Sequence, residues 1–400
     1  MSAKSSNAAA DFSLVLILFF TSRLMLLLAF PPENLIYYGD YQHYFNVAAM
    51  SRSGFYPYIH YWYEFPPIFP YLNIAVYTLA GQQLKNYILL LAFVLLLAEC
   101  GNLYLLYRLA LTLFDRTRAL TTAWIYTALF TPIFFWLGNF DALTTFFILL
   151  ALYSLLKNRR FLLIAALGLG TMVKFLPVVL LAAVWRRWGL KTAVICGTAT
   201  LLICLFIFGP FAFANPTMTL TSLQAQAGKS SYQTVWAIVD GNLTTGNFGP
   251  LADHFDPAKA TRPINNPARL PTWLTLIPFG LLGLFIFTRP AGSNPDQDTI
   301  VFTTLTFIIF FLWSQGWSPQ WQTFLIPLLL LTFSEKRAVL FIIALSFISF
   351  LEWPVILSRG LNQLLPLTII LRTLLLILIT VELYRLLIPP TSTKTKNSTR

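Results

Sequence analysis

Long apolar segments follow one another along most of this chain, and short polar connections separate them. The first runs from Phe12 to Phe30, and the others occupy residues 87–107, 119–137, 142–156, 161–185, 190–213, 272–288, 299–313, 321–333, 338–357 and 364–388. A helix that crosses a bilayer needs about 20 mainly apolar residues, and several of these runs are shorter. Their repetition nevertheless predicts an all-α fold, a polytopic bundle of transmembrane helices.

The segment 31–86 departs from this pattern. It is rich in Tyr, Pro and Trp, and it carries Asp40, His43 and Glu64. The segment is too polar for a membrane span, and Tyr and Trp favour the headgroup level, so we expect an ordered loop at the membrane interface. Within this loop, Ile68–Leu79 is apolar but short, and it predicts a helix that lies in the interface.

The segment 214–271 is the second long polar stretch. It is rich in Asn, Gly, Pro and Thr, and it contains Trp236, Asp240 and His254. Loops of this length in a compact protein are usually functional or disordered. No soluble domain or internal repeat is evident, so we expect a single membrane domain over residues 1–400.

The composition agrees with a membrane protein. Of the 400 residues, 57% are hydrophobic and 10% are charged, whereas soluble domains carry about 25% charged residues. The formal net charge is +12, but Lys and Arg form short clusters between apolar runs, which the positive-inside rule explains better than nucleic-acid binding does. Cys100, Cys196 and Cys204 lie within apolar runs and predict neither a disulfide nor a zinc site.

The basic clusters predict the topology. They are formed by Arg108, Arg116 and Arg118, by Lys157, Arg159 and Arg160, by Arg186, Arg187 and Lys191, by Lys336 and Arg337, and by Arg385, Lys394, Lys396 and Arg400. If all of them are cytoplasmic, segment 161–185 must cross the membrane twice, with a reversal near Lys174. We therefore expect about twelve spans, with both termini in the cytoplasm and both long loops on the outer or periplasmic face.

Two acidic residues stand out because carboxylates are scarce in this chain. Asp40 follows the first span in Tyr37-Tyr38-Gly39-Asp40-Tyr41. It is a candidate general base, but it could equally be a solvated loop residue or the N-cap of a helix over 41–50. Asp141 lies between two apolar runs with almost no loop, and it predicts either a helix cap or a side chain in a polar cavity.

Lys174 is the sharpest single signal. It stands among apolar residues, and an intramembrane cation is costly and functional by default. It could hold an anionic phosphate, or it could form an ion pair with a buried acid such as Glu99 or Glu352. Glu64 could pair, bind a hydroxyl or face water. His43, like the other histidines, maps outward and has no metal-ligand spacing.

Four segments resemble the GT-C superfamily of membrane glycosyltransferases, and most closely glycosyltransferase family 87, whose members include mannosyltransferases that use polyprenyl-phosphate mannose. These segments are the first outer loop from Gly39-Asp40-Tyr41 to Phe65-Pro66-Pro67, the motif Gly138-Asn139-Phe140-Asp141, the motif Val173-Lys174-Phe175-Leu176-Pro177, and Ser318-Pro319-Gln320-Trp321. The family often has Tyr where this chain has Phe65 and Trp321. The resemblance implies a GT-C type fold.

The resemblance also implies a reaction. Asp40 would deprotonate an acceptor hydroxyl, which attacks the anomeric carbon with inversion and expels polyprenyl phosphate. Lys174 would neutralise that phosphate, and Asp141 and Gln320 would line the sugar or acceptor site. We add His43, Tyr63, Glu64 and Trp236 as candidate substrate-binding residues because they lie in the outer loops.

The implied partners are a polyprenyl-phosphate sugar donor, a glycolipid or glycan acceptor and membrane lipids. No catalytic metal or cofactor is expected, because the chain lacks the paired acidic motif of the metal-dependent relatives that transfer oligosaccharides. Two other functions stay open. A transporter or lipid flippase would suit the span count and Lys174, although no repeated halves are evident. A membrane acyltransferase would need an intramembrane histidine.

Overall fold

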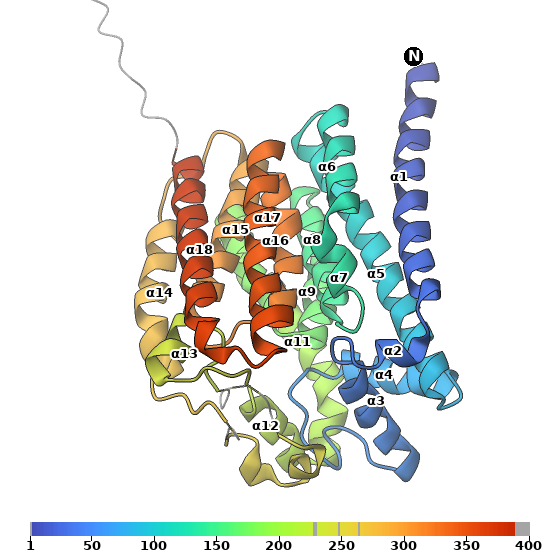
Figure 1. Cartoon of the computed structure of the whole chain (residues 1–400). Helices are drawn as coiled ribbons and strands as arrows, with labels where there is room; N and C mark the ends of the chain where they lie inside the picture. The colour runs from blue at the N-terminus through green and yellow to red at the C-terminus, as the bar shows by residue number, and fades with distance from the viewer. Residues whose placement is uncertain (1, 227–229, 247–248, 263–264, 389–400) are drawn as a thin grey trace, which may run out of the picture.

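A computed structural model describes residues 2–226, 230–246, 249–262 and 265–388 (Figure 1). Within these residues the chain forms helices and loops and no β-strand. The helices of the first half are α1 (Ser2–Ala29), α2 (Pro32–Leu35), α3 (Tyr41–Ala49), η1 (Met50–Ser53), α4 (Ile68–Leu79), α5 (Leu84–Leu113), α6 (Arg116–Ala128), α7 (Phe130–Phe135), α8 (Asp141–Leu156), α9 (Arg160–Val173), η2 (Leu176–Leu180) and α10 (Leu181–Trp188).

The second half contains a further set of helices, in which η6 is a single π-helical segment. They are α11 (Leu190–Ala214), α12 (Pro216–Gln224), α13 (Val235–Asp240), η3 (Leu251–Phe255), η4 (Pro257–Lys259), α14 (Thr272–Phe287), α15 (Pro295–Trp313), η5 (Pro319–Trp321), α16 (Gln322–Thr332), α17 (Glu335–Phe350), η6 (Leu351–Leu357), η7 (Asn362–Leu364) and α18 (Leu365–Leu387).

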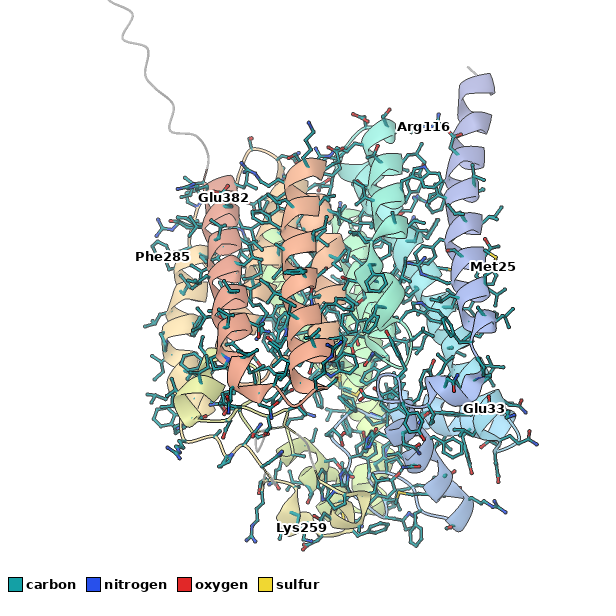
Figure 2. All side chains as sticks on the ribbon, in the orientation of Figure 1. Met25, Glu33, Arg116, Lys259, Phe285 and Glu382 are labelled. Atoms are coloured by element: carbon teal, nitrogen blue, oxygen red, sulfur yellow. The ribbon has the colours of Figure 1, made fainter. Side chains whose placement is uncertain are left out.

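The prediction of an all-α polytopic membrane bundle is confirmed. In the part of the chain that the structure describes, six segments are long and apolar enough to span a bilayer: Asp11–Ala29, Leu84–Leu113, Leu190–Ala214, Pro295–Trp313, Glu335–Leu357 and Asn362–Leu387. Figure 2 shows Met25 and Phe285 pointing away from the bundle on opposite sides, and these apolar side chains are 63% and 45% exposed. A lipid environment explains this exposure.

The path of the chain agrees with an even number of crossings. The start of α1 and the end of α18 lie at the same end of the bundle in Figure 1. The basic loops gather at that end, where Arg116 pairs with Asp11, and Arg337 pairs with Glu382. The count of about twelve spans and the cytoplasmic placement of this end stay predictions.

The predicted reversal near Lys174 is confirmed. Helix α9 ends at Val173, and Lys174 has an extended backbone with φ −156° and ψ 135°. Pro177, which follows in η2, cannot donate a backbone hydrogen bond to continue α9. The chain then returns through α10, and the indole nitrogen of Trp188 donates a 3.1 Å hydrogen bond to Asn158 near the start of α9.

Some predicted boundaries were wrong. Helix α5 begins at Leu84, so the first outer loop ends before residue 86. The run 119–137 is broken at Leu129, where α6 gives way to α7. Pro132 explains this break, because its ring would clash with the carbonyl of Ala128 in a continuous helix.

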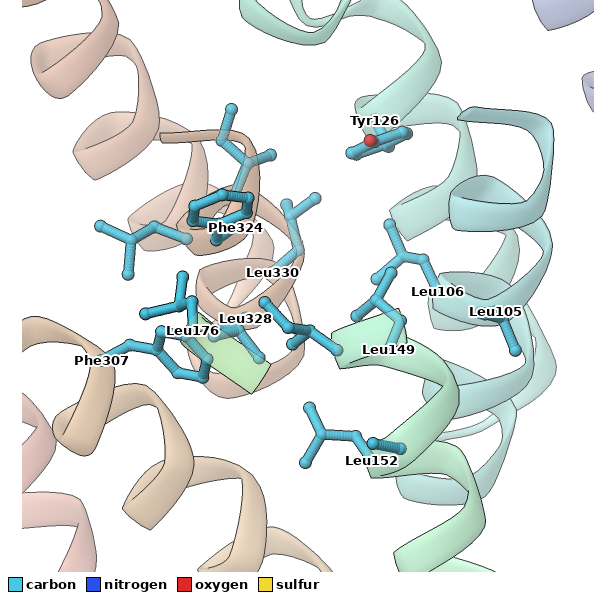
Figure 3. Packing of buried hydrophobic residues seen from close by; sticks show 14 of the residues in the cluster. Leu105, Leu106, Tyr126, Leu149, Leu152, Leu176, Phe307, Phe324, Leu328 and Leu330 are labelled. Atoms are coloured by element: carbon cyan, nitrogen blue, oxygen red, sulfur yellow. The ribbon is translucent and has the colours of Figure 1, made fainter. Parts of the chain in front are cut away.

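The centre of the bundle is filled by α5, α8 and α16. All residues of α16, from Gln322 to Thr332, are buried. A helix that is apolar on every side belongs inside a large protein. Figure 3 shows side chains of these helices, such as Leu106, Leu149 and Leu328, packed between the ribbons.

The two long loops fold together at the end of the bundle that lies opposite the start of α1 (Figure 1). The first contains α2 to α4, and the predicted interfacial helix Ile68–Leu79 is present as α4. The rings of Trp62 and His254 stack with their centroids 3.9 Å apart, and the backbone N–H of Trp62 donates a 3.0 Å hydrogen bond to the carbonyl of His254. Within the described residues, loop 214–271 is therefore packed rather than detached.

Candidate active site

Two glycines bring Asp40 to the turn between α7 and α8. Gly39 and Gly138 have φ values of +57° and +70°, which favour glycine. A methyl group on Gly138 would lie 2.5 Å from the carbonyl oxygen of Tyr38. This close approach allows the backbone amide of Asp40 to donate a 2.9 Å hydrogen bond to the carbonyl of Gly138. The first outer loop is thereby fixed to the membrane bundle.

Asp40 precedes α3 but does not cap it through its side chain. Its carboxylate instead accepts a 3.2 Å hydrogen bond from the hydroxyl of Tyr44, one helical turn later. Burial, and then the charge of Asp40, raise the pKa of Tyr44 well above its usual value, so this hydroxyl remains a donor. Asp40 is thus the N-cap residue of α3, as one alternative predicted, but its carboxylate is bound by Tyr44 and does not cap the helix.

The carboxylate of Asp40 faces a polar cavity of about 230 Å³. The described residues that line this cavity are Gly39, Asp40, His43, Tyr44, Glu64, Phe65, Phe135, Asn139, Tyr232, Gln233, Thr245, Gly246, Ser318, Pro319, Gln320 and Trp353. Asp40 is exposed to the cavity, and the protein walls around it reduce its solvation. This desolvation raises the pKa of Asp40, and the charge of His43 and the Tyr44 hydrogen bond oppose the rise.

Short helices recess the cavity into the bundle. Helices α8, α9 and α16 have 16, 14 and 11 residues, and each has one end beside the site. At 1.5 Å per residue they cover roughly 24, 21 and 16 Å, less than the ~30 Å hydrocarbon core. Their ends are therefore drawn inward, toward a region of low dielectric constant.

Lys174 is paired with Asp141, and this settles the partner of the intramembrane cation. Its Nζ lies 2.6 Å from Oδ1 of Asp141, and the two side chains are 16% and 3% exposed. The alternative of an ion pair with a buried acid is confirmed, but the acid is neither of the two named: Glu352 pairs with Arg372, and Glu99 accepts hydrogen bonds from Asn102 and Tyr126. The ammonium of Lys174 also lies 5.4 Å from the ring centroids of three aromatic residues, namely Phe140, Trp321 and Phe324.

An apolar groove of about 260 Å³, with Lys174 in its wall, lies beside the polar cavity. Its described lining residues are Phe65, Pro66, Lys174, Phe175, Leu176, Val178, Val179, Gln226, Phe310 and Trp321. Phe65 lines both spaces, and Trp321 of the groove follows Gln320 of the cavity. Lys174 is the one charged side chain among the described groove residues, and its charge acts on the carboxylate of Asp40 in the cavity.

The structure brings together most of the predicted site residues. Asp40, His43, Glu64 and Gln320 line the cavity. Nε2 of His43 lies 3.8 Å from Oε1 of Glu64. Burial lowers the pKa of His43, and the charge of Asp40 opposes this. Tyr63 lies behind this wall, with its ring stacked at 6.2 Å on that of His43.

Besides Tyr63 and Lys174, two more predicted residues lie outside the cavity lining. Asp141 does not contact the cavity, and its carboxylate is committed to Lys174, so it orients that lysine rather than lining a sugar site. Trp236 lies beside α14 and α15, where its indole donates a 3.2 Å hydrogen bond to the carbonyl of Leu312. The sequence placed Trp236 in the correct loop but could not show which way that loop folds.

Tyr44, Tyr232, Gln233 and Trp353 also line the cavity and were not predicted as site residues. Tyr44 could have been found, because it lies four residues after Asp40 at the start of a helix. Tyr232 reaches the cavity through a bridge to Gly316, and it forms a side-chain hydrogen bond with Ser318. No local signal predicts that contact. Burial raises the pKa of Tyr232.

Among the described residues, no group of three or more His, Cys, Asp or Glu side chains could hold a metal ion. The expectation of a metal-independent reaction stays a prediction.

Comparisons with known proteins add a distant likeness only. No family model matches the chain, and no curated protein matches it. A solved structure of the apo form of the Archaeoglobus fulgidus oligosaccharyltransferase is similar to it with 13% sequence identity and a TM-score of 0.46, covering 94% of this chain and 56% of that chain. This chain thus spans little more than half of that protein's length. A likeness this distant carries no argument on function, and the resemblance to glycosyltransferase family 87 stays a prediction.

Proposed function

We propose that this membrane protein transfers a hexose, most simply mannose, from a polyprenyl-phosphate donor to an acceptor hydroxyl at the outer face of the membrane. One observation carries this proposal. The carboxylate of Asp40 faces a polar cavity, and Lys174 lines an apolar groove that shares Phe65 with that cavity. A substrate with a sugar, a phosphate and a lipid tail matches these three environments in the same order.

The size of the cavity favours one sugar unit. Its volume of about 230 Å³ is below the roughly 300–1,000 Å³ that drug-sized ligands occupy. A donor that carries a single hexose therefore leaves more room for an acceptor beside Asp40 than an oligosaccharide donor would. The groove would take the first part of the lipid, with the rest of the tail in the bilayer.

The proposed reaction is a single displacement. Asp40 removes the proton of the acceptor hydroxyl while its oxygen attacks the anomeric carbon, and the bond from that carbon to the phosphate oxygen breaks. The base contributes roughly 10² to 10⁴ in rate. The product has the inverted configuration, and polyprenyl phosphate leaves with the electron pair.

Lys174 would stabilise the leaving phosphate. Its ammonium has three N–H donors, and one of them is used by Asp141. The remaining donors can meet phosphate oxygens at the mouth of the groove. Charge stabilisation in a site with little water is worth more than the same contact in bulk solvent.

The other candidate functions receive less support from the geometry. A transporter needs a path to the opposite end of the bundle, but side chains of α5, α8 and α16 fill its centre (Figure 3). An acyltransferase of the expected kind needs an intramembrane histidine, whereas His43, His60 and His254 all lie in the two long loops.

The test is a transfer assay with purified protein in lipid. Radiolabelled polyprenyl-phosphate mannose is supplied with a panel of glycan and glycolipid acceptors, and the anomeric configuration of the product is determined. We expect a mannoside of inverted configuration, and free polyprenyl phosphate should inhibit by occupying the groove. Retained configuration, or movement of the intact donor across the membrane without a product, would overturn the proposal.

A further inference from the structure

One wall of the polar cavity lies away from the apolar groove. Gln233 and Trp353 line this wall, and neither these residues nor their neighbours in the chain line the groove. In an inverting displacement the acceptor approaches on the face opposite the leaving group. An acceptor would therefore meet Asp40 from lining that the groove does not share, and Gln233 and Trp353 belong to that lining.

A buried ion pair holds this wall. Glu352 of η6 and Arg372 of α18 form an ion pair, and their side chains are 0% and 2% exposed. The side-chain amide of Gln233 donates a 3.0 Å hydrogen bond to the carboxylate of Glu352. The guanidinium of Arg372 also donates to the backbone carbonyl of Gln233. Both charged residues thus bind the same loop residue.

The ion pair joins three segments that are distant in the sequence. Gln233 has a φ of +53°, a conformation that a non-glycine residue needs support to hold. Glu352 lies in a π-helical segment, and such segments often occur at functional sites. Trp353, which follows Glu352 directly, lines the cavity. The guanidinium of Arg372 lies 4.8 Å from the ring centroid of Trp317, which precedes Ser318 of the cavity.

The charges of the cavity indicate what it can accept. Asp40 and Glu64 are carboxylates, and no described lining residue is Lys or Arg. An anionic acceptor would be repelled by these carboxylates and would have no cation to bind. Tyr232 and Thr245 offer hydroxyl groups, and Trp353 offers an aromatic ring, which are the groups that bind the hydroxyls and apolar faces of a sugar.

We propose that the wall of Gln233 and Trp353 is an acceptor subsite for an uncharged carbohydrate, and that the Glu352–Arg372 pair positions it. Trp353 contacts the acceptor. Glu352 and Arg372 are positioning residues that act through Gln233 and Trp353. This inference rests on the proposed function, and it specifies the class of acceptor that the function leaves open.

The experiment uses the full chain in lipid with two acceptor probes, octyl α-mannoside and its 6-phosphate. Steady-state transfer from polyprenyl-phosphate mannose gives KM for each substrate, and binding of octyl α-mannoside is measured separately without donor. The variants are Trp353→Ala, Glu352→Gln and the conservative Glu352→Asp. Trp124→Ala serves as a matched control, because Trp124 lies on α6 and is 42% exposed, outside the cavity lining.

We expect Trp353→Ala and Glu352→Gln to raise the KM for octyl α-mannoside about tenfold, equivalent to about 1.4 kcal/mol, while the KM for the donor is unchanged. Glu352→Asp should recover part of this loss, and the 6-phosphate should be a poor acceptor. A merely structural role would change both KM values and the folded fraction together.

Three results would overturn the acceptor subsite. They are equal use of the phosphorylated probe, a rise in donor KM instead of acceptor KM, and octyl α-mannoside binding that is indifferent to Trp353 and Glu352. The proposed function fails in a different way. If the wild-type protein binds octyl α-mannoside, loses this binding on Trp353→Ala and yet transfers no sugar, the subsite holds and the donor assignment is wrong.

Discussion

The Lys174–Asp141 pair allows a quantitative test of the site. Asp141→Asn leaves the ammonium of Lys174 without its carboxylate at a place where the two side chains are only 16% and 3% exposed. Removing one partner of a buried pair costs about 3–5 kcal/mol. Because this ammonium still lies over three aromatic rings and reaches the groove, we expect the lower part of that range, about 3–4 kcal/mol.

The double variant Asp141→Asn/Lys174→Met measures the coupling free energy between the two charges. It removes both charges, so it leaves no uncompensated charge in the bundle. We expect it to be more stable, by about 1 kcal/mol or more, than the sum of the two single-variant effects predicts. The assay is reversible unfolding in detergent for the wild type, the two single variants and the double variant. Donor binding is measured on the same preparations.

The two single variants should differ in function. Lys174→Met should lose binding of the polyprenyl-phosphate donor, whereas Asp141→Asn should bind it more weakly but measurably, because the cation is retained. Additive stabilities in the double-mutant cycle would show that the pair contributes no coupling. Unchanged donor binding in Lys174→Met would refute the assignment of this cation to the phosphate.

Three further predictions concern the backbone, the pH dependence and the topology. Gly138→Ala should destabilise the protein by about 2–4 kcal/mol in detergent unfolding, because the new methyl group would lie 2.5 Å from a carbonyl oxygen. The control is Gly81→Ala, at a residue with φ +64° and open space around it, and it should cost about 1–2 kcal/mol. Equal effects of the two substitutions would contradict the close approach at Gly138. Desolvation raises the pKa of Asp40, so kcat/KM should fall as the pH drops through that raised pKa. Tyr44→Phe should shift this acidic fall of kcat/KM to higher pH, because it removes a hydrogen bond to the charged carboxylate. A fall at the ordinary aspartate pKa, or one that Tyr44→Phe does not shift, would count against Asp40 as the base. The topology is tested with single cysteines after the three native cysteines are replaced. A cysteine at position Ser53 should be labelled by an impermeant maleimide in intact cells, and one at position Ser334 only after permeabilisation. The reverse pattern would invert the topology.

The course of the chain through the membrane could largely be predicted from hydrophobicity and charge. The reversal at Lys174 followed from basic residues on both flanks of one apolar run, because positive loops stay on one side of the membrane. The helix Ile68–Leu79 was also visible in the sequence, since a short apolar stretch between polar segments forms a helix to satisfy its backbone.

The partners of the buried charges could not be predicted in the same way. Asp141 and Lys174 lie in different helices, and the sequence gives no register between them. Arg372 lies inside an apolar run and passed unnoticed, although it binds Glu352 and the loop that carries Gln233. Such contacts depend on how distant segments pack, and local periodicity contains no information about that.

The candidate site was predictable only in part for the same reason. Asp40, Glu64 and Gln320 converge as the outer loops predicted. Trp236 lies in the expected loop but packs against Leu312 instead. Membership of a loop indicates on which side of the membrane a residue lies, whereas the direction of its side chain depends on the turns within that loop.

The most direct test of the central claim is sugar transfer by Asp40→Asn. The substitution keeps the size of the side chain and removes its capacity to accept a proton. The matched control is Asp253→Asn, which changes a surface pair with Lys259 away from the cavity. Donor binding and unfolding are measured for both variants alongside transfer from polyprenyl-phosphate mannose.

If Asp40 is the general base, Asp40→Asn will fold and bind the donor as the wild type does, yet transfer will fall by about 10² to 10⁴. Asp253→Asn will transfer at the wild-type rate. Full transfer by a folded Asp40→Asn variant would contradict the assignment of the base, and with it the reaction proposed for this cavity.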